Sequence, residues 1–421
     1  MQAYSLEVLA LRRILGQGKT YRETIFRILS TERVSTSSVL ELKRTVFGVL
    51  RRYFSLSHDV EKNFPSYGRD SDERYLLLLT LFLLRQKKER EEVKENFLRT
   101  FSDLRLVGDP SFLFDRLSEL GKTAFLLPEE LKASPYAYNA LALEIPEFLL
   151  HDLVFSYGAE KAKGIALSLR EMPSAVYVRN VFSSADGSLP GRIYALKRGH
   201  AFLLPKDCNT RKIPEIVKRT FYPVDLIKLL AIDQLSIDGL SFQALLLNQR
   251  TPFLAAYLDG IYQDLPQISV TPVFVKEQRY RSSIEWLKEI GSKNVKPLLS
   301  SLELAKTYFP EESMDFVALQ GDDVFLGKAG MRPDVLPDLT KKDMQESFSL
   351  QTNQLLQASP FVKKAGFLLF LNAGITMEET RNVRESFLSL RKNFELVADH
   401  VLLPIDEGTE GGYFALFRRV S

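Results

Sequence analysis

Apolar residues in the first 140 positions of the chain recur at helical spacing. One series runs from Leu6 to Ile14 and another from Val46 to Phe54. Breaks are expected where Gly, Pro, Ser and Thr gather, at positions 16–18, 34–38 and 65–68. The Ser and Thr cluster in the second of these breaks fits a helix N-cap. Because no convincing alternating strand pattern occurs here, we expect residues 5–140 to form helices only.

The pattern changes near position 145, where helical stretches begin to alternate with short runs rich in β-forming residues. The β-rich runs lie at 175–178, 268–275, 315–319 and 366–371. The helical stretches include 146–157, 279–290 and 342–358. Such alternation predicts a parallel sheet with helices on both faces. The last two segments, 397–404 and 412–418, predict a closing antiparallel pair of strands.

Composition and charge add one asymmetry to this picture. A hydrophobic content of 45% and a charged content of 26% are ordinary for a globular protein. The net charge is +3, but residues 1–100 hold 19 Lys and Arg against 13 Asp and Glu, so that they carry +6 and the remainder carries −3. A basic segment on a nearly neutral body suggests an anionic partner. A solvated helical surface with surplus Lys and Arg is the alternative.

The sequence lacks the features that mark membrane or secreted proteins. The longest apolar run, Tyr75–Leu84, has about half the length that a bilayer-spanning helix needs, and it predicts a buried helix instead. The first ten residues lack the basic start and long apolar stretch of a secretion signal. Cys208 is the only cysteine, which excludes an internal disulfide framework and a cysteine metal site, and the four histidines have no metal-ligand spacing. We expect a cytoplasmic protein that binds no metal.

Short motifs along the chain are similar to those of a known family. Phe47–Arg52 and Glu95–Arg99 look like helix signatures of a NusB-like domain, and Ile145–Leu149 resembles the segment that enters a methyltransferase half. By the order and spacing of these motifs, nearly the whole chain resembles the bacterial ribosomal RNA cytosine-5 methyltransferases of the Sun, or RsmB-like, group. The resemblance implies three parts: an all-α NusB-like RNA-binding domain at 1–140, a connecting subdomain at 141–225, and an α/β Rossmann-type methyltransferase domain with a mixed, mostly parallel sheet at 226–421.

The family continues with a proline pair and a short Leu-Arg-x-Asn run. Pro173 and Asn180 fit this pattern, whereas Val178 stands where the arginine belongs. Arg179 follows one position later and is a candidate replacement for that arginine.

The positions at which the family binds S-adenosylmethionine carry other residue types here. A Gly-rich turn should follow the first strand, because the cofactor approaches the backbone closely there. The matching stretch, Leu245–Leu254, contains neither glycine nor an acid, and Leu246 stands within it. Phe274 occupies the place of the acid that holds the ribose, and Ser300 that of the acid near the adenine. The resemblance therefore implies a cofactor site without its usual contacts, and we expect no bound cofactor.

The catalytic motifs differ from the family in the same way. The family's reaction needs one cysteine thiolate to attack the base and a second cysteine to release the enzyme. Asp323 and Ala373 stand at these two positions, within Gln320–Asp323 and Asn372–Ala373. Cys208 is far from both motifs in the sequence. The adjacent acids Asp322 and Asp323 leave a metal-binding or general-base role open, although adjacent acids in a loop are more often solvated.

The hypothesis favoured by these features is a non-catalytic RNA-binding protein on a methyltransferase scaffold, acting on ribosomal RNA or on the small ribosomal subunit during its assembly. The candidate RNA contacts are Arg51, Arg52, Arg85, Lys87, Lys88, Arg90 and Arg179. For Lys87–Glu92, a solvated helix face of mixed charge is the alternative. Two other functions stay open. One is an active S-adenosylmethionine-dependent enzyme that uses Gly327–Gly330 or Gly408–Gly412 as its cofactor turn, and the other is a protein-binding scaffold or partner subunit.

Overall fold

The computed structural model describes residues 4–421 except positions 33–34, 124, 185–186, 207 and 237–239. The chain divides into two compact units. The first comprises Met1–Arg170 with Met331–Lys341, and the second comprises Glu171–Gly330 with Lys342–Ser421. In the described part of the chain, no helix combines the length and the apolar character that a membrane crossing requires. The finer division of the chain at positions 140 and 225 stays a prediction.

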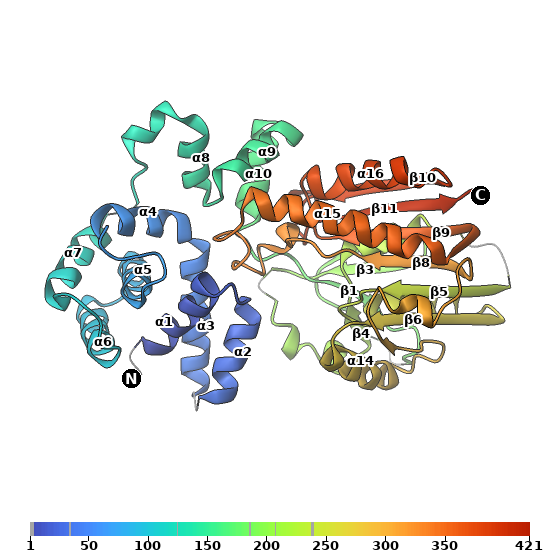
Figure 1. The fold of residues 1–421 in the computed structure, drawn as a ribbon. Coiled ribbons are helices and arrows are strands. Elements are labelled where there is room, and N and C mark those ends of the chain that lie inside the picture. The colour runs from blue at the N-terminus through green and yellow to red at the C-terminus, as the bar shows by residue number, and fades with distance from the viewer. Residues whose placement is uncertain (1–3, 33–34, 124, 185–186, 207, 237–239) are drawn as a thin grey trace. The chain divides into compact units, whose positions relative to one another are not determined.

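Every regular element described between residues 4 and 170 is helical, which confirms the prediction for this part of the chain (Figure 1). The α-helices are α1 (Ser5–Leu11), α2 (Tyr21–Thr31), α3 (Thr36–Arg51), α4 (Tyr53–Asn63), α5 (Asp72–Arg85), α6 (Arg90–Asp103), α7 (Pro110–Lys122), α8 (Pro135–Leu143), α9 (Glu147–Tyr157) and α10 (Ala159–Ser168). The expected N-cap is also present, because the Ser35 side chain accepts a hydrogen bond from the backbone N–H of Ser38 at the start of α3.

Helix α5 forms the centre of the helical unit because its sequence is apolar on all sides. Tyr75–Leu79 are buried, and so are Leu81 and Leu83. Helices α1, α3, α4, α6 and α7 all pack against α5. A helix that is hydrophobic all round is stable only when it is buried, and each leucine removed from water contributes about 1.5–3 kcal/mol. The longest apolar run of the sequence is therefore the core helix of this unit.

The second unit contains a seven-stranded sheet in the order β10-β11-β9-β8-β5-β6-β7. Its strands are β5 (Ser241–Leu247), β6 (Gln267–Phe274), β7 (Leu298–Leu299), β8 (Met314–Gln320), β9 (Val362–Asn372), β10 (Phe394–Leu402) and β11 (Gly412–Arg419). All pairs from β7 to β9 are parallel, whereas β11 is antiparallel to both of its neighbours. The mixed, mostly parallel sheet and its closing antiparallel pair are therefore confirmed.

Helices cover both faces of this sheet. One core joins alternate residues of β5, such as Phe242 and Leu246, to α12 (Leu226–Asp233), α13 (Phe253–Tyr262) and α14 (Glu277–Ile290). The residues between them, such as Leu245, join a second core with α15 (Lys341–Ala358) and α16 (Val383–Leu390). Because successive strand residues point to opposite faces, the near-continuous apolar run of β5 supplies both cores.

A small antiparallel sheet precedes the large one in the chain. Its strands are β1 (Val176–Arg179), β2 (Arg192–Leu196), β3 (Gly199–Leu203) and β4 (Phe221–Pro223), in the order β2-β3-β1-β4. The sequence predicts only the first of them. Strand β2 shows no alternation of apolar and polar residues, since Ile193 is 61% exposed and Arg192 and Ala195 are also exposed. Such a strand gives no periodic signal.

A buried carboxylate on α13 holds the loop that follows α14. Asp259 accepts hydrogen bonds from the Ser292 hydroxyl at 2.6 Å, from the Lys293 backbone N–H at 3.0 Å and from the Asn294 side-chain amide at 2.9 Å. The Asp259 side chain is buried. The Asn294 backbone N–H also donates to Asp259, at 3.4 Å, so four donors would lose their acceptor if it were removed. The cost of each unsatisfied buried donor is about 1–3 kcal/mol.

We expect Asp259→Ala to lower the free energy of unfolding of the α/β unit by about 3 kcal/mol. Urea unfolding followed by the fluorescence of Trp286, the only tryptophan of the chain, measures this because Trp286 lies on α14. The control is Asp264→Ala, which removes an exposed carboxylate from the same region and should change stability by less than about 0.5 kcal/mol. Equal effects of the two substitutions would contradict the assignment.

Candidate functional site

The loops after β8 and β9 meet at the carboxyl edge of the parallel sheet, where folds of this class bind ligands. The Asp323 carboxylate accepts hydrogen bonds from the backbone N–H groups of Ala373 and Phe325. Its side chain is fully buried. The structure therefore brings together the two positions at which the sequence motifs place the catalytic cysteines. They hold a carboxylate and a methyl group.

A second buried carboxylate, Glu379, lies beside this contact. Its Oε1 accepts hydrogen bonds from the Val324 backbone N–H at 3.1 Å and from the Ser347 hydroxyl at 2.7 Å. Its Oε2 is buried and has no hydrogen-bond partner among the described residues. Burial, and then the nearby charge of Asp323, raise the pKa of Glu379 to about 7. Burial also raises the pKa of Asp323, against the opposing effect of Arg250.

The Arg250 side chain occupies the space in front of the loop after β8. Its Nη2 donates to the Gly321 carbonyl at 3.2 Å and to Asp322 Oδ1 at 3.1 Å. Its guanidinium lies over the Phe325 ring, 4.1 Å from the ring centroid. A cavity of about 140 Å³ remains beside Arg250. This is below the range of roughly 300–1,000 Å³ that is usual for sites of small molecules and cofactors.

The loop after β5 makes its hydrogen bonds to the protein itself. Asn248 adopts a φ of 55° and donates its side-chain amide to the Gln320 carbonyl at 2.8 Å. The backbone N–H of Gln249 donates to the Val273 carbonyl at 2.8 Å. In a Gly-rich cofactor turn these groups would face the ligand. Here they tie β5 to the neighbouring strands β8 and β6.

The residues at the expected cofactor positions do not fit S-adenosylmethionine. Leu246 lies inside β5 and Phe274 ends β6, and both side chains are fully buried in apolar surroundings. Ser300 follows β7, and its backbone N–H donates to the Phe274 carbonyl at 3.0 Å. None of these three side chains offers a carboxylate to ribose hydroxyls or to an adenine.

The two glycine segments that the sequence leaves open as cofactor turns pack against each other. The Gly411 backbone N–H donates to the Gly327 carbonyl at 2.8 Å, and the Gly327 N–H donates to the Ala373 carbonyl at 2.7 Å. A Cβ atom on Gly327 would lie 2.5 Å from the Gly411 carbonyl oxygen. Gly327 is therefore required by a close approach of two backbones. Lys328 forms ion pairs with Asp225 and Glu410 in the same region.

Glu379 makes the stability of this region depend on pH. The pKa of Glu379 is about 7 in the folded protein, against an ordinary value of 4.5. Between these two pH values the folded protein keeps a proton on Glu379 that the unfolded chain has lost. Stability is therefore expected to fall as the pH rises from 4.5 to 7. Glu379→Gln resembles the protonated acid and does not ionise. We expect the variant to match the wild type near pH 4.5 and to exceed it by about 3 kcal/mol at pH 8.

Urea unfolding at both pH values tests this expectation. The control is Glu385→Gln, which replaces an exposed acid on the following helix. A stability difference between wild type and Glu379→Gln that does not change with pH would contradict the buried-acid assignment.

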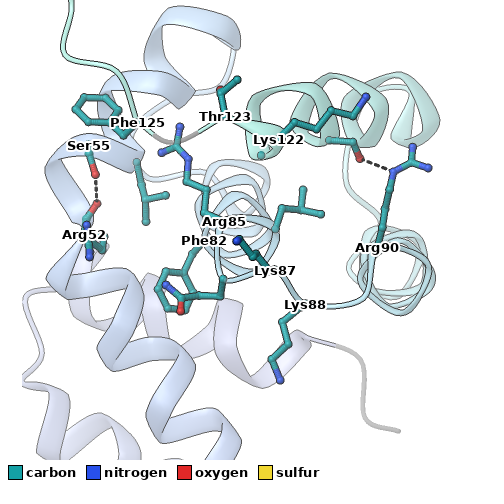
Figure 2. A pocket seen from close by; sticks show the side chains of 15 residues that line it. Arg52, Ser55, Phe82, Arg85, Lys87, Lys88, Arg90, Lys122, Thr123 and Phe125 are labelled. Atoms are coloured by element: carbon teal, nitrogen blue, oxygen red, sulfur yellow. Dashed lines mark hydrogen bonds between the residues drawn. The ribbon is translucent and has the colours of Figure 1, made fainter.

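The helical unit contains a basic pocket of about 460 Å³. Its lining includes six cationic residues and, in the described part of the chain, no acidic residue: the six are Arg52, Arg85, Lys87, Lys88, Arg90 and Lys122. Figure 2 shows their side chains around the pocket together with the rings of Phe82 and Phe125. Five of the seven RNA contacts proposed from the sequence are thus brought together. RNA binding by these residues stays a prediction.

Helix ends explain why the cations gather here. Arg52 follows α3, Arg85 ends α5 and Lys122 ends α7. A cation at the C-terminal end of a helix is favoured by the helix dipole, and the fold places these ends around one pocket. Lys122 was not among the residues proposed from the sequence. Its position at the end of an apolar helical series was the available signal.

Some of the pocket's charge is already balanced by neighbouring acids. Arg85 forms an ion pair with Asp59. Lys88 lies 3.7 Å from Glu41, and Arg90 lies 3.5 Å from Asp115 and 3.4 Å from Glu91. No ion pair is described for the side chains of Arg52 and Lys87 among the described residues, and both are exposed.

The other two proposed RNA contacts lie elsewhere. Arg51 does not line the pocket, and its guanidinium lies 4.4 Å from the centroid of the Phe47 ring. Arg179 ends β1 in the α/β unit. Cys208 is half-buried and packs against the small sheet. No group of three or more His, Cys, Asp or Glu residues with the geometry of a metal site occurs in the described ranges.

Comparisons with known proteins agree with this fold. No protein-family model matches the sequence, and no curated protein matches it. Among solved structures, the protein PH0851 is 16% identical, with a TM-score of 0.75, covering 100% of this chain and 99% of that one.

Two further structures match a smaller part of the chain. A methyltransferase homolog protein from Pyrococcus horikoshii is 15% identical, with a TM-score of 0.57, covering 68% of this chain and 99% of its own. NSun6 from Pyrococcus horikoshii is 15% identical, with a TM-score of 0.55, covering 66% of this chain and 98% of its own. The likeness is one of fold: a helical region followed by a Rossmann-type, methyltransferase-like sheet.

Proposed function

We propose that this protein binds RNA and uses its methyltransferase fold as a scaffold without catalysis. The observation that carries the proposal is the basic pocket of the helical unit, where six cationic side chains line one cavity. Phosphate groups are the natural partners of such a cluster, since most protein contacts to nucleic acids are made by Lys, Arg and other donors to the backbone. The aromatic rings of Phe82 and Phe125 in the same lining suit an unpaired base. The resemblance to the ribosomal RNA methyltransferases favours ribosomal RNA or the small subunit as the target.

The proposed absence of catalysis is supported by the chemistry at the two loop positions. A cytosine is activated at C5 when a thiolate adds to C6. Asp323 is held in hydrogen bonds to two backbone N–H groups, and Ala373 has no nucleophilic or basic group. Even a thiol introduced at one of these positions would lack a bound methyl donor, because the loop after β5 is closed onto the protein.

A protein-binding scaffold is the competing proposal, and it predicts an apolar surface in the altered site. The side chains there are charged or polar: Arg250, Asp322, Asp323, Gln354 and Glu379. Asp322 exchanges hydrogen bonds with Gln354, with its Oδ2 accepting at 2.8 Å and its N–H donating at 3.0 Å. This composition argues against the apolar docking surface that a protein-binding site here would need.

Neutralising the basic pocket tests the RNA proposal. We expect the triple variant Arg52→Gln, Lys87→Gln, Lys122→Gln to bind small-subunit ribosomal RNA fragments more weakly. Each lost phosphate contact should reduce the slope of log affinity against log salt by about 0.7–1. Fluorescence anisotropy between about 50 and 200 mM salt measures both quantities, and this range is chosen because phosphate contacts are strongest at low salt.

The matched control removes the same charge from the same unit. Arg22, Lys62 and Lys132 are exposed and do not line the pocket. Their triple change to Gln should reduce affinity and salt slope much less than the pocket variant does. An equal loss in both variants would show that net charge alone attracts the RNA. Undetectable binding at about 50 mM salt would reject RNA as the partner.

The second test concerns the cofactor. Calorimetric titration with S-adenosylmethionine should give no binding tighter than about 1 mM. The physical reasons are the buried Leu246 and Phe274 and the Arg250 side chain across the loop after β8. Micromolar binding would overturn the proposal of a lost cofactor site and would reopen the enzymatic alternative.

A further inference from the structure

The α/β unit contains a second cavity, of about 560 Å³, between the small sheet and α13. Its lining comes from β1, β3 and β4, from the turn that carries Arg198, and from Tyr257 and Gly260–Tyr262 in the second half of α13. Helix α13 begins after the carboxyl end of β5 and returns toward the start of β6, as in any parallel crossover. Its last turns therefore lie away from the carboxyl edge that holds Asp323 and Glu379. The cavity is distinct from the altered methyltransferase site.

This cavity combines aromatic rings with cations. The rings of Phe202, Tyr222, Tyr257 and Tyr262 line it. Its basic lining residues are Arg179, Arg198 and His200, and no acid is found among the described lining residues. Aromatic and guanidinium planes that stack bases, next to cations that hold phosphates, are the usual composition of sites for single-stranded RNA.

Arg198 is fixed in position before any ligand arrives. Its Nη1 donates to the Tyr262 hydroxyl and its Nη2 donates to the Leu235 carbonyl at 3.1 Å. The guanidinium lies over the Tyr262 ring, 4.9 Å from the ring centroid. Ordering a long side chain costs entropy on binding. Because Arg198 is already ordered by the protein, a ligand that contacts it avoids much of that cost.

The Tyr257 hydroxyl supplies an independent indication of a ligand. Tyr257 lines the cavity and is only 7% exposed, and its hydroxyl is buried without a hydrogen-bond partner among the described residues. Leaving a buried polar group unsatisfied is unfavourable. Burial, and then the charge of Asp233, raise the pKa of Tyr257 to about 12. The hydroxyl keeps its proton at neutral pH, and that donor is not used by the described residues.

We propose that this cavity binds one unstacked nucleotide of a single-stranded RNA, with the base among the tyrosine rings and beside the Tyr257 hydroxyl, and the phosphate near Arg179 and Arg198. The inference rests on the proposed function for RNA as the partner, but it concerns a different unit of the protein. A free nucleotide offers the same base and phosphate chemistry. The experiment therefore compares the two sources directly.

The test uses full-length protein and Tyr257→Phe, which removes only the hydroxyl. Labelled oligouridylate and oligoadenylate of about six nucleotides are titrated by anisotropy, and uridine and adenosine 5′-monophosphates are titrated as competitors. Loss of one hydrogen bond should weaken oligonucleotide binding about threefold to tenfold. Loss of a hydroxyl with a structural role would lower the melting temperature, whereas removing an unsatisfied buried hydroxyl should leave it unchanged or raise it. We expect weaker binding together with unchanged or higher thermal stability.

Tyr177→Phe is the matched control. Tyr177 precedes Val178 on β1, does not line the cavity, and belongs to the apolar cluster of Leu189, Leu204 and Phe221. It should leave oligonucleotide affinity unchanged. Arg179→Gln should weaken binding and reduce the salt slope by about 0.7–1.

Tyr257→Phe and Arg179→Gln are each repeated in the triple variant in which the basic pocket of the helical unit has been neutralised. Retention of the Tyr257→Phe effect in that background supports the second site. If the oligonucleotide binds but Tyr257→Phe changes its affinity in neither background, the inference is rejected while the helical pocket is unaffected. If neutralising the helical pocket changes nothing but Tyr257→Phe still weakens binding, the proposed helical site fails and the inference stands. Binding of free monophosphate without binding of the oligonucleotide rejects the RNA strand as the occupant.

Discussion

The parallel pairing of β8 with both β5 and β9 is the constraint on which the α/β unit depends. It places the ends of three strands, Leu247, Gln320 and Asn372, at one edge of the sheet. The loops that leave this edge have to satisfy their backbone groups with one another or with a ligand. In this protein they satisfy one another: Asp323 accepts from Ala373, and the Asn248 side chain donates to the Gln320 carbonyl.

These contacts stabilise the carboxyl edge of the methyltransferase-like sheet from within the protein. A cofactor turn keeps glycine so that a ligand approaches the main chain closely. Asn248 adopts a positive φ although it is not a glycine. Its side-chain amide donates a hydrogen bond to the carbonyl of Gln320 at the end of β8. Arg250 fills adjacent space and lies over Phe325. The backbone arrangement is thus stabilised by internal polar contacts.

The sequence predicts the fold better than it predicts the site. The reason is that secondary structure depends on neighbouring residues, whereas the site brings together residues that are far apart in the sequence. Helix α5 and strand β8 are recognisable from local apolar patterns, because burial is encoded in neighbouring residues. The contact between Asp323 and Ala373 could be predicted only from the spacing of the family motifs. The coupling of Asp323 to Glu379 had no local signal, since the two residues are separated by the whole of α15 and β9. The exposed strand β2 has no periodic pattern. Because the small sheet could not be predicted in full, the cavity between that sheet and α13 could not be predicted either.

The placement of charge argues for local recognition over long-range attraction. With a net charge of +3, the whole protein has only a weak field at physiological salt, where screening acts over about 8 Å. An anionic polymer would therefore be held chiefly by cations within contact distance. Six such residues line the pocket of the helical unit, and Arg179 and Arg198 line the cavity beside α13. Arg198 is held in place by hydrogen bonds to Tyr262 and Leu235, whereas Arg52 and Lys87 are exposed. A bound strand would therefore have to order more side chains in the helical pocket than in the cavity beside α13. The ordered site favours selection of an unpaired nucleotide, and the exposed site favours sequence-independent retention of the backbone.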